Sequence, residues 1–211
     1  GTVSSCISTG NALGVFLSNS YENRFIGFQI FGNTGSDGGM YLYASPRNSF
    51  ESSYIYSNTY TGVTLMLSHY NVFIGNFVQR NGVTGINNLG SNHNIYSNNF
   101  INDNSQTTNG TREDIYMATS GGIHSSYNII TENIFSTTLA NKVDYMIYED
   151  GAAQDYNIIK NNNFLPAGTA GTFFKSGVND KVSGNIGYVT ESSGTAGSIA
   201  LGVTHEHITH G

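Results

Sequence analysis

The sequence predicts an all-β chain that winds into a parallel β-helix of about seven coils. Three observations predict this fold: an asparagine motif repeats along most of the chain, only short strands lie between its copies, and charged residues are scarce. Only 10% of the 211 residues are charged, whereas an average globular domain has about 25%. So little charge is not typical of solvent-facing helices, whereas 26 glycines, 14 tyrosines and 12 phenylalanines suit turns and strands.

The repeating unit is an asparagine, any residue and an apolar residue, followed a few positions later by a second asparagine with its own apolar neighbour. Copies begin at Asp180, in degenerate form, and at Asn23, Asn48, Asn71, Asn94, Asn128 and Asn157. The commonest spacing is 23 residues, and the two longest intervals, 94 to 128 and 128 to 157, contain insertions. A repeat of this length is typical of a solenoid, because one unit buries its apolar face only against the next.

A short strand with alternating apolar residues precedes each motif. In chain order these strands occupy residues 15–17, 40–43, 63–66, 86–88, 115–117, 145–147 and 172–174. Each motif adds about two further strands, which are too short for a sandwich and are not separated by any helical periodicity. Three short strands in each coil therefore predict a parallel β-helix, in which neighbouring coils satisfy each other's backbone hydrogen bonds.

Two columns of polar residues are expected to stabilise the coils. Asparagine adopts left-handed corner conformations easily, and stacked asparagine amides can hydrogen-bond to one another as a ladder. We therefore interpret both columns as structural. The first consists of Asn23, Asn48, Asn71, Asn94, Asn128 and Asn157. The second consists of Ser53, Asn76, Asn99, Asn133, Asn162 and Asn185.

These repeats resemble those of the pectin-lyase-like superfamily, which includes NosD-type and phage-spike repeat proteins. The resemblance lies in segments such as GVFLSNSYENRFIG (14–27) and NIYSNNFINDN (94–104), and it covers roughly residues 10–187. It implies a right-handed β-helix, which we assign to residues 1–189. It implies no particular activity, because the superfamily contains lyases, hydrolases, epimerases, tailspikes and non-catalytic surface proteins. The catalytic motifs of polygalacturonase-like hydrolases and of alginate epimerases are missing from the sequence.

Alternation in the first strand of each coil predicts an uncharged aromatic stripe on its outer side. The side chains expected to point outward are Phe16, Tyr41, Tyr43, Thr64, Met66, Tyr116, Met146, Tyr148 and Phe174. A long exposed apolar stripe is unusual on a soluble monomer, so something is expected to cover it. The alternatives are another copy of the chain, a glycan whose sugar rings stack on the aromatic rings, or an inserted loop such as residues 102–113.

Carboxylates gather toward the end of the repeats. The catalytic candidates are Asp114, Asp144, Glu149, Asp150 and Asp155, and Glu113 adjoins the first of them. Two carboxyl groups about 5 to 10 Å apart would suit glycoside hydrolysis, and Asp114 and Asp144 are expected at similar positions in successive strands. The alternative is that these acids are solvated turn residues. His69 and His93 likewise form either a turn pair or an acid–base couple.

The remaining candidates are isolated. Cys6 is the single cysteine, and zinc-type Cys/His spacings are absent, so we expect no metal and no cofactor. His205, His207 and His210 could together hold a metal, or are simply tail residues. Asn109 begins an Asn-Gly-Thr sequon that could be glycosylated outside the cell.

Charge and hydropathy narrow the function classes. Eight basic residues, scattered singly, against 14 acidic ones give a net charge of −6, which argues against nucleic-acid binding. No apolar run approaches the roughly 18 residues of a membrane span. Residues 190–211 are predicted to form a linker and a C-terminal strand, an arm that adds to a neighbouring chain or opens a further β domain.

The favoured hypothesis is a non-catalytic extracellular or virion-surface module, such as a fibre, spike or filament subunit or an adhesin. It would form a homo-oligomer through its aromatic face and C-terminal arm, with contact to a polysaccharide or cell-surface glycan as a further role. The alternatives are a polysaccharide-active lyase, glycoside hydrolase or epimerase, and a monomeric lectin-like binder.

Overall fold

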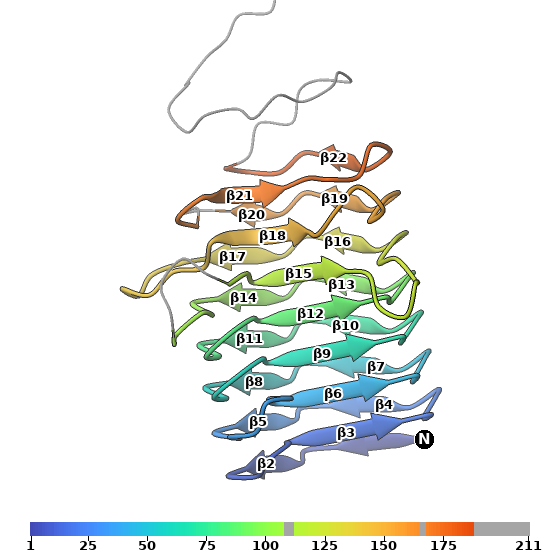
Figure 1. Ribbon diagram of the computed structural model, residues 1–211. Coiled ribbons are helices and arrows are strands. Elements are labelled where there is room, and N and C mark those ends of the chain that lie inside the picture. Colours follow the sequence, from blue (N-terminus) through green and yellow to red (C-terminus); the bar gives the residue numbers. More distant parts are fainter. Residues whose placement is uncertain (108–111, 165–167, 188–211) are drawn as a thin grey trace, which may run out of the picture.

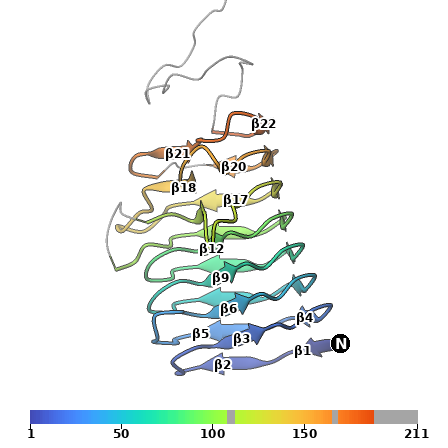
Figure 2. The ribbon, with the colours of Figure 1, turned by 45° about the vertical axis from the view of Figure 1, so that its right-hand side comes forward.

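The computed structural model describes residues 1–107, 112–164 and 168–187 and confirms the β-helix of about seven coils (Figure 1). Its strands form three parallel sheets, named sheets A, B and C here, and each sheet takes every third strand of the chain. Figure 2 shows the coils stacked along one axis, with the N-terminus at one end. No helix occurs in the described ranges, so none of them supplies a helix able to cross a membrane.

Each sheet has one strand in almost every coil. Sheet A consists of β1 (Thr2–Ser4), β4 (Arg24–Ile26), β7 (Ser49–Glu51), β10 (Val72–Ile74), β13 (Ile95–Ser97), β16 (Ile129–Thr131), β19 (Ile158–Lys160) and β22 (Lys181–Ser183). Sheet B consists of β2 (Ile7–Thr9), β5 (Gln29–Phe31), β8 (Tyr54–Tyr56), β11 (Phe77–Gln79), β14 (Phe100–Asn102), β17 (Ile134–Ser136) and β20 (Asn163–Phe164). Sheet C consists of β3 (Val15–Ser18), β6 (Met40–Tyr43), β9 (Val63–Met66), β12 (Ile86–Leu89), β15 (Ile115–Ala118), β18 (Tyr145–Glu149) and β21 (Gly171–Phe174).

The core is a set of side-chain stacks, because equivalent residues of successive coils pair in register. Inside sheet A, Phe25, Phe50, Phe73 and Tyr96 stack with ring centroids 4.8, 4.8 and 5.5 Å apart. All four rings are buried. Burying one such ring stabilises the fold by about 1.5–3 kcal/mol, so the stacks account for much of the cohesion between coils.

Buried asparagines join the coils at the corners. In the first predicted column, the backbone N–H of Asn48 donates to Asn71 Oδ1, and that of Asn71 donates to Asn94 Oδ1, both at 2.8 Å. In the second column, the Nδ2 of Asn76 donates to Asn99 Oδ1 at 3.0 Å. The ladder amides thus bind the backbone of a neighbouring coil as well as each other.

The ladder asparagines do not themselves occupy the left-handed corners, so that expectation is wrong. In the first column the residue just before the asparagine has the positive φ, which is 59° at Tyr70, 58° at His93 and 58° at Tyr127. The asparagine itself is not among the residues with positive φ, and its buried side chain accepts the N–H of the coil before it. The corner and the ladder are therefore neighbouring positions.

A third ladder exists that the sequence interpretation overlooked. The Nδ2 groups of Asn33, Asn58 and Asn81 donate to the Oδ1 of the next member at 2.9 to 3.0 Å, and the series ends at Asn104. The glycines that directly precede the strands of sheet C pack against it. A Cβ at Gly62 would lie 2.7 Å from Asn81 Nδ2, so only glycine fits beside this ladder.

Candidate functional site

The outer side of sheet C carries two aromatic regions with polar residues between them. One column of paired outward positions consists of Phe16, Tyr41, Thr64, Asn87, Tyr116, Tyr148 and Phe174. Phe16 stacks on Tyr41 at 5.7 Å, and at the other end Tyr148 stacks on Phe174 at 4.7 Å. Threonine and asparagine in the middle interrupt the rings, so the face is not one continuous aromatic stripe.

A second outward column runs beside the first. Tyr43 is 39% exposed, and Met66, half-buried, accepts a hydrogen bond on its Sδ from the hydroxyl of Tyr41 at 3.2 Å. Leu89 follows Met66 in the same column. These side chains extend the aromatic region at the N-terminal end toward the middle of the face.

Met146 was expected to point outward, and this prediction is wrong because Met146 is fully buried in the core. Ile147 pairs with Ile115, so Met146 lies level with Asp114, the residue just before β15. Both side chains are therefore inside. Tyr145, which alternation with Met146 would place inside, is instead half-buried, and its ring centroid lies 5.6 Å from that of Phe174.

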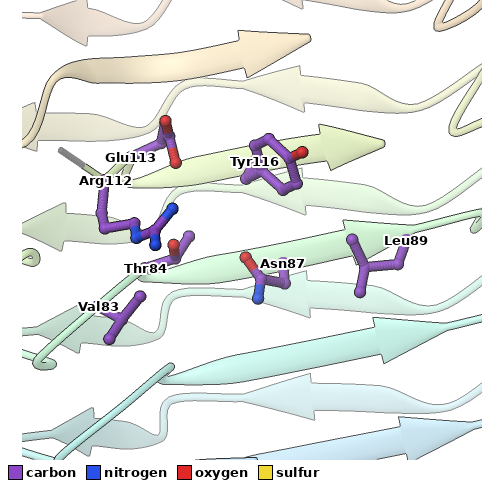
Figure 3. Close-up of a pocket in the computed structure, with 7 residues that line it drawn as sticks. All are labelled: Val83, Thr84, Asn87, Leu89, Arg112, Glu113 and Tyr116. Atoms are coloured by element: carbon purple, nitrogen blue, oxygen red, sulfur yellow. The ribbon is translucent and has the colours of Figure 1, made fainter. Parts of the chain in front are cut away.

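A pocket of about 280 Å³ lies in the middle of this face, between the two aromatic regions (Figure 3). Its lining residues are Val83, Thr84, Asn87, Leu89, Arg112, Glu113 and Tyr116. Strands β12 and β15 supply three of them, and the segments leading into these strands supply the other four. Its volume is close to the lower limit of small-ligand pockets, which suits one sugar residue of a longer chain.

The pocket holds one basic and one acidic side chain. Arg112 extends toward Thr84 (Figure 3), and its guanidinium forms no ion pair or hydrogen bond with any described residue. Burial raises the pKa of Glu113 to about 7; Arg112 lowers it, whereas the carboxylates of Asp144 and Asp150 add to the rise. The pocket can therefore offer a cation that has no ionic partner among the described residues and, at neutral pH, a carboxyl group that takes up a proton readily.

Tyr116 is held in place at the pocket wall. Its hydroxyl donates to Asp150 Oδ2 at 2.6 Å, and burial together with this carboxylate raises the pKa of Tyr116. The phenol therefore stays protonated over the physiological range. Among the described residues, Asp150 is thus the one predicted catalytic candidate whose side chain hydrogen-bonds to a pocket residue, and it orients Tyr116.

The other predicted carboxylates do not assemble into a site. Asp114 and Asp144 do not occupy equivalent positions in their coils. The N–H of Asp144 donates to the carbonyl of Arg112, which lies two residues before Asp114 in the chain. Asp114 is buried and caps the last member of the third ladder, because its Oδ1 accepts a hydrogen bond from Asn104 Nδ2 at 2.6 Å. Burial raises its pKa well above the ordinary range.

The remaining three carboxylates are either buried or hydrogen-bonded to neighbouring turns. Glu149 is fully buried, whereas Asp155 accepts hydrogen bonds from the N–H and Nδ2 of Asn179, both at 2.6 Å. Asp144 lies at the surface of the turn before β18, 3.3 Å from Thr169 Oγ1. From the sequence, Glu113 was noted only as a neighbour of Asp114, and Arg112 was missed. The available signal was that Arg112 stands next to an acidic residue shortly before a predicted strand.

The two histidines form parts of turns. The Nδ1 of His69 accepts the N–H of Asn92 at 3.0 Å, and burial lowers its pKa. The ring of His93 lies between those of Tyr70 and Tyr127, with centroids 4.8 and 5.1 Å away. The turn-pair interpretation therefore fits these contacts better than an acid–base couple.

Several predictions fall outside the described residues. They concern the sequon at Asn109, the C-terminal linker and arm at 190–211, and the three histidines His205, His207 and His210.

Solved structures of similar shape include three polysaccharide-active enzymes. The mannuronan C-5 epimerase A-modules AlgE6 and AlgE4 of Azotobacter vinelandii have TM-scores of 0.69 and 0.61, with 15% and 18% identity over 90% and 87% of this chain. An alginate lyase from Paenibacillus sp. str. FPU-7 has a TM-score of 0.53, with 13% identity over 88% of this chain and 90% of its own. This chain spans 58% and 57% of the two epimerase modules, and identities this low show a shared fold alone. No curated protein matches the sequence.

Residues 1–132 match the family described as "Periplasmic copper-binding protein (NosD)". The residues described do not fit a copper site: no group of three or more His, Cys, Asp or Glu side chains in those ranges could hold a metal ion. Cys6 is exposed, and His69 and His93 are engaged as above. Because the match covers more than half of the chain, the protein belongs to the NosD family of right-handed β-helix proteins, a periplasmic family.

Proposed function

We propose that this chain binds an acidic polysaccharide along the outer face of sheet C, with a uronate residue in the pocket and its carboxylate on Arg112. The observation that carries the proposal is that Arg112 lines this pocket without an ionic partner among the described residues. In a chain of net charge −6, a cation placed in this way is complementary to an anionic ligand.

The rest of the face supports a polymer rather than a small ion. Asn87 and Thr84 supply amide and hydroxyl groups for sugar hydroxyls, while Tyr148 and Phe174 offer stacked rings beyond one side of the pocket. The epimerases and the lyase of similar fold are named for uronic-acid polymers, mannuronan and alginate. The proposal places this binding outside the cytoplasm, in line with the periplasmic family.

The binding is tested by titrating the protein with hexamannuronate and with mannohexaose, its neutral counterpart, by calorimetry at pH 5.5. We expect the acidic oligomer to bind more tightly. Replacing Arg112 by alanine should weaken hexamannuronate binding at least tenfold, which corresponds to about 1.4 kcal/mol, because the ligand carboxylate loses its charged partner.

A matched control removes a positive charge elsewhere. Lys160 is exposed on sheet A, and Lys160→Ala should change the affinity less than twofold. Equal effects of the two variants, or no affinity in the folded wild-type protein, would contradict the proposal. Shortened or unsaturated products in the titration mixtures would instead indicate the enzymatic alternative.

Assembly of several copies is a second candidate, favoured by the exposed aromatic region at the N-terminal end of sheet C. Phe16 is 55% exposed although it stacks on Tyr41, and Tyr43 beside it is also exposed. We expect light scattering to give a mass above 22.7 kDa that falls to that of one chain when Phe16 and Tyr43 are changed to serine. A single-chain mass in the wild-type protein would contradict assembly.

A further inference from the structure

Arg112 and Glu113 place opposite charges in one confined space. Both line the pocket of about 280 Å³, and they are consecutive in the chain (Figure 3). Glu113 precedes the paired residue Ile115 by two positions, as Thr84 does for Ile86, so the two side chains are level in adjacent coils. A ligand carboxylate bound to Arg112 therefore lies in the same small space as the carboxyl group of Glu113.

The groups around Glu113 are mainly acidic. They are the cation of Arg112, the carboxylates of Asp144 and Asp150, the buried carboxyl of Asp114, and the phenols of Tyr116 and Tyr148. Arg112 is the one positive charge among them. Its charge does not suffice for both an ionised Glu113 and an ionised ligand, because two carboxylates confined side by side cannot both stay charged without a large cost.

We propose that Glu113 is a specificity-determining residue that must be protonated when a uronate occupies the pocket, so that binding takes up one proton from solvent. This inference rests on the proposed function. The proton binds to the carboxyl group of Glu113, which then donates a hydrogen bond to the carboxylate of the ligand. No bond of the sugar is broken.

The position of Glu113 makes this protonation accessible near neutral pH. Its pKa of about 7 in the free protein, raised first by burial, means that the acid form is already well populated there. A bound anion adds a further negative charge and raises this pKa again. A neutral sugar has no such effect, so the proton requirement distinguishes acidic from neutral ligands.

The test is calorimetric titration with hexamannuronate and mannohexaose between pH 5.5 and pH 8.5. The apparent Kd for hexamannuronate should be constant at low pH and rise above pH 7, approaching about tenfold for each pH unit. Repeating the titration at pH 8 in buffers of different ionisation enthalpy should show uptake of about one proton. Any affinity for mannohexaose should not vary with pH.

Two variants assign the proton to its residue. Glu113→Gln keeps a hydrogen-bond donor without a charge, so its affinity for hexamannuronate should stay near the wild-type value at pH 5.5 and should not depend on pH. Glu113→Ala should bind more weakly and equally without pH dependence. Circular dichroism spectra and thermal unfolding establish that both variants are folded.

The outcomes separate this inference from the function on which it rests. A wild-type protein that binds hexamannuronate with no pH dependence would overturn the role of Glu113 and leave the binding site intact. A slope that persists in Glu113→Gln would place the proton elsewhere and overturn it as well. No binding of hexamannuronate at pH 5.5 by the folded protein would defeat both.

Discussion

Replacing Asn99 by alanine is expected to lower the free energy of unfolding by about 3–5 kcal/mol, because this one side chain joins three coils. Its Oδ1 accepts hydrogen bonds from the backbone N–H and the Nδ2 of Asn76, at 2.9 and 3.0 Å. Its Nδ2 donates to Asn133 Oδ1 and to the carbonyl of Phe73, both at 3.0 Å. Truncation leaves the buried N–H of Asn76 without a partner. Urea denaturation followed by circular dichroism measures the loss.

The neighbouring Asn98 provides the control. It is exposed, with φ of 55°, and its amide bonds only to surface groups, Ser97 and Glu132. Because glycine accepts this backbone conformation readily, Asn98→Gly should cost less than about 1 kcal/mol. If both substitutions cost the same, the corner and not the ladder would be the source of stability.

The repeat made the fold predictable, because one local geometry recurs at nearly constant spacing. Members of a ladder 23 residues apart, such as Asn48 and Asn71, are the residues that meet across coils. The third ladder had the same signal, since Asn33, Asn58 and Asn81 follow the same spacings. It was overlooked because it ends early, where an insertion follows Asn104.

The pocket was not predictable to the same degree, for a physical reason. Arg112 and Glu113 follow an insertion that breaks the period, so counting residues does not tell which residues of the preceding coil they meet. Differing insertion lengths also produced the wrong alignment of Asp114 with Asp144. The inward position of Met146 has the same origin, because the chain enters β18 at a corner where alternation does not hold.

Buried Glu149 and half-buried Asp180, near the C-terminal coils, should make stability depend on pH. Glu149 Oε1 accepts Asn157 Nδ2 at 2.9 Å, and its Oε2 accepts the N–H groups of Ser176 and Gly177 at 3.0 and 3.1 Å. Asp180 Oδ1 accepts the N–H of Asn157 at 2.7 Å, as an asparagine does elsewhere in the first ladder. Burial, and then the charge of Asp180, raises the pKa of Glu149 to about 8, and burial raises that of Asp180 too.

The sign of the pH effect follows from these directions. In the unfolded chain both acids titrate near pH 4, so between about pH 4.5 and pH 8 the folded protein holds more protons. The stabilisation is fully present below this window, and it is lost as pH rises through the pKa of folded Glu149. The pKa values of Glu113 and Asp114 are also raised, so these two acids change the stability with pH in the same direction. We expect the pair to lower the unfolding free energy by an amount on the order of 4 kcal/mol between pH 5 and pH 8.

Asp180→Asn isolates the contribution of the pair, because asparagine is the residue that the ladder uses at this position. Its Oδ1 can accept the N–H of Asn157, and its amide can donate to Glu149 instead of repelling it. The variant should exceed the wild-type unfolding free energy by about 2 kcal/mol at pH 8 and match it at pH 5 within about 0.5 kcal/mol. Urea denaturation at both pH values measures this. For the control Asp37→Asn, at an exposed turn, the unfolding free energy should change with pH in parallel with that of the wild-type protein. A parallel profile for Asp180→Asn as well would show that the charge of Asp180 does not destabilise ionised Glu149.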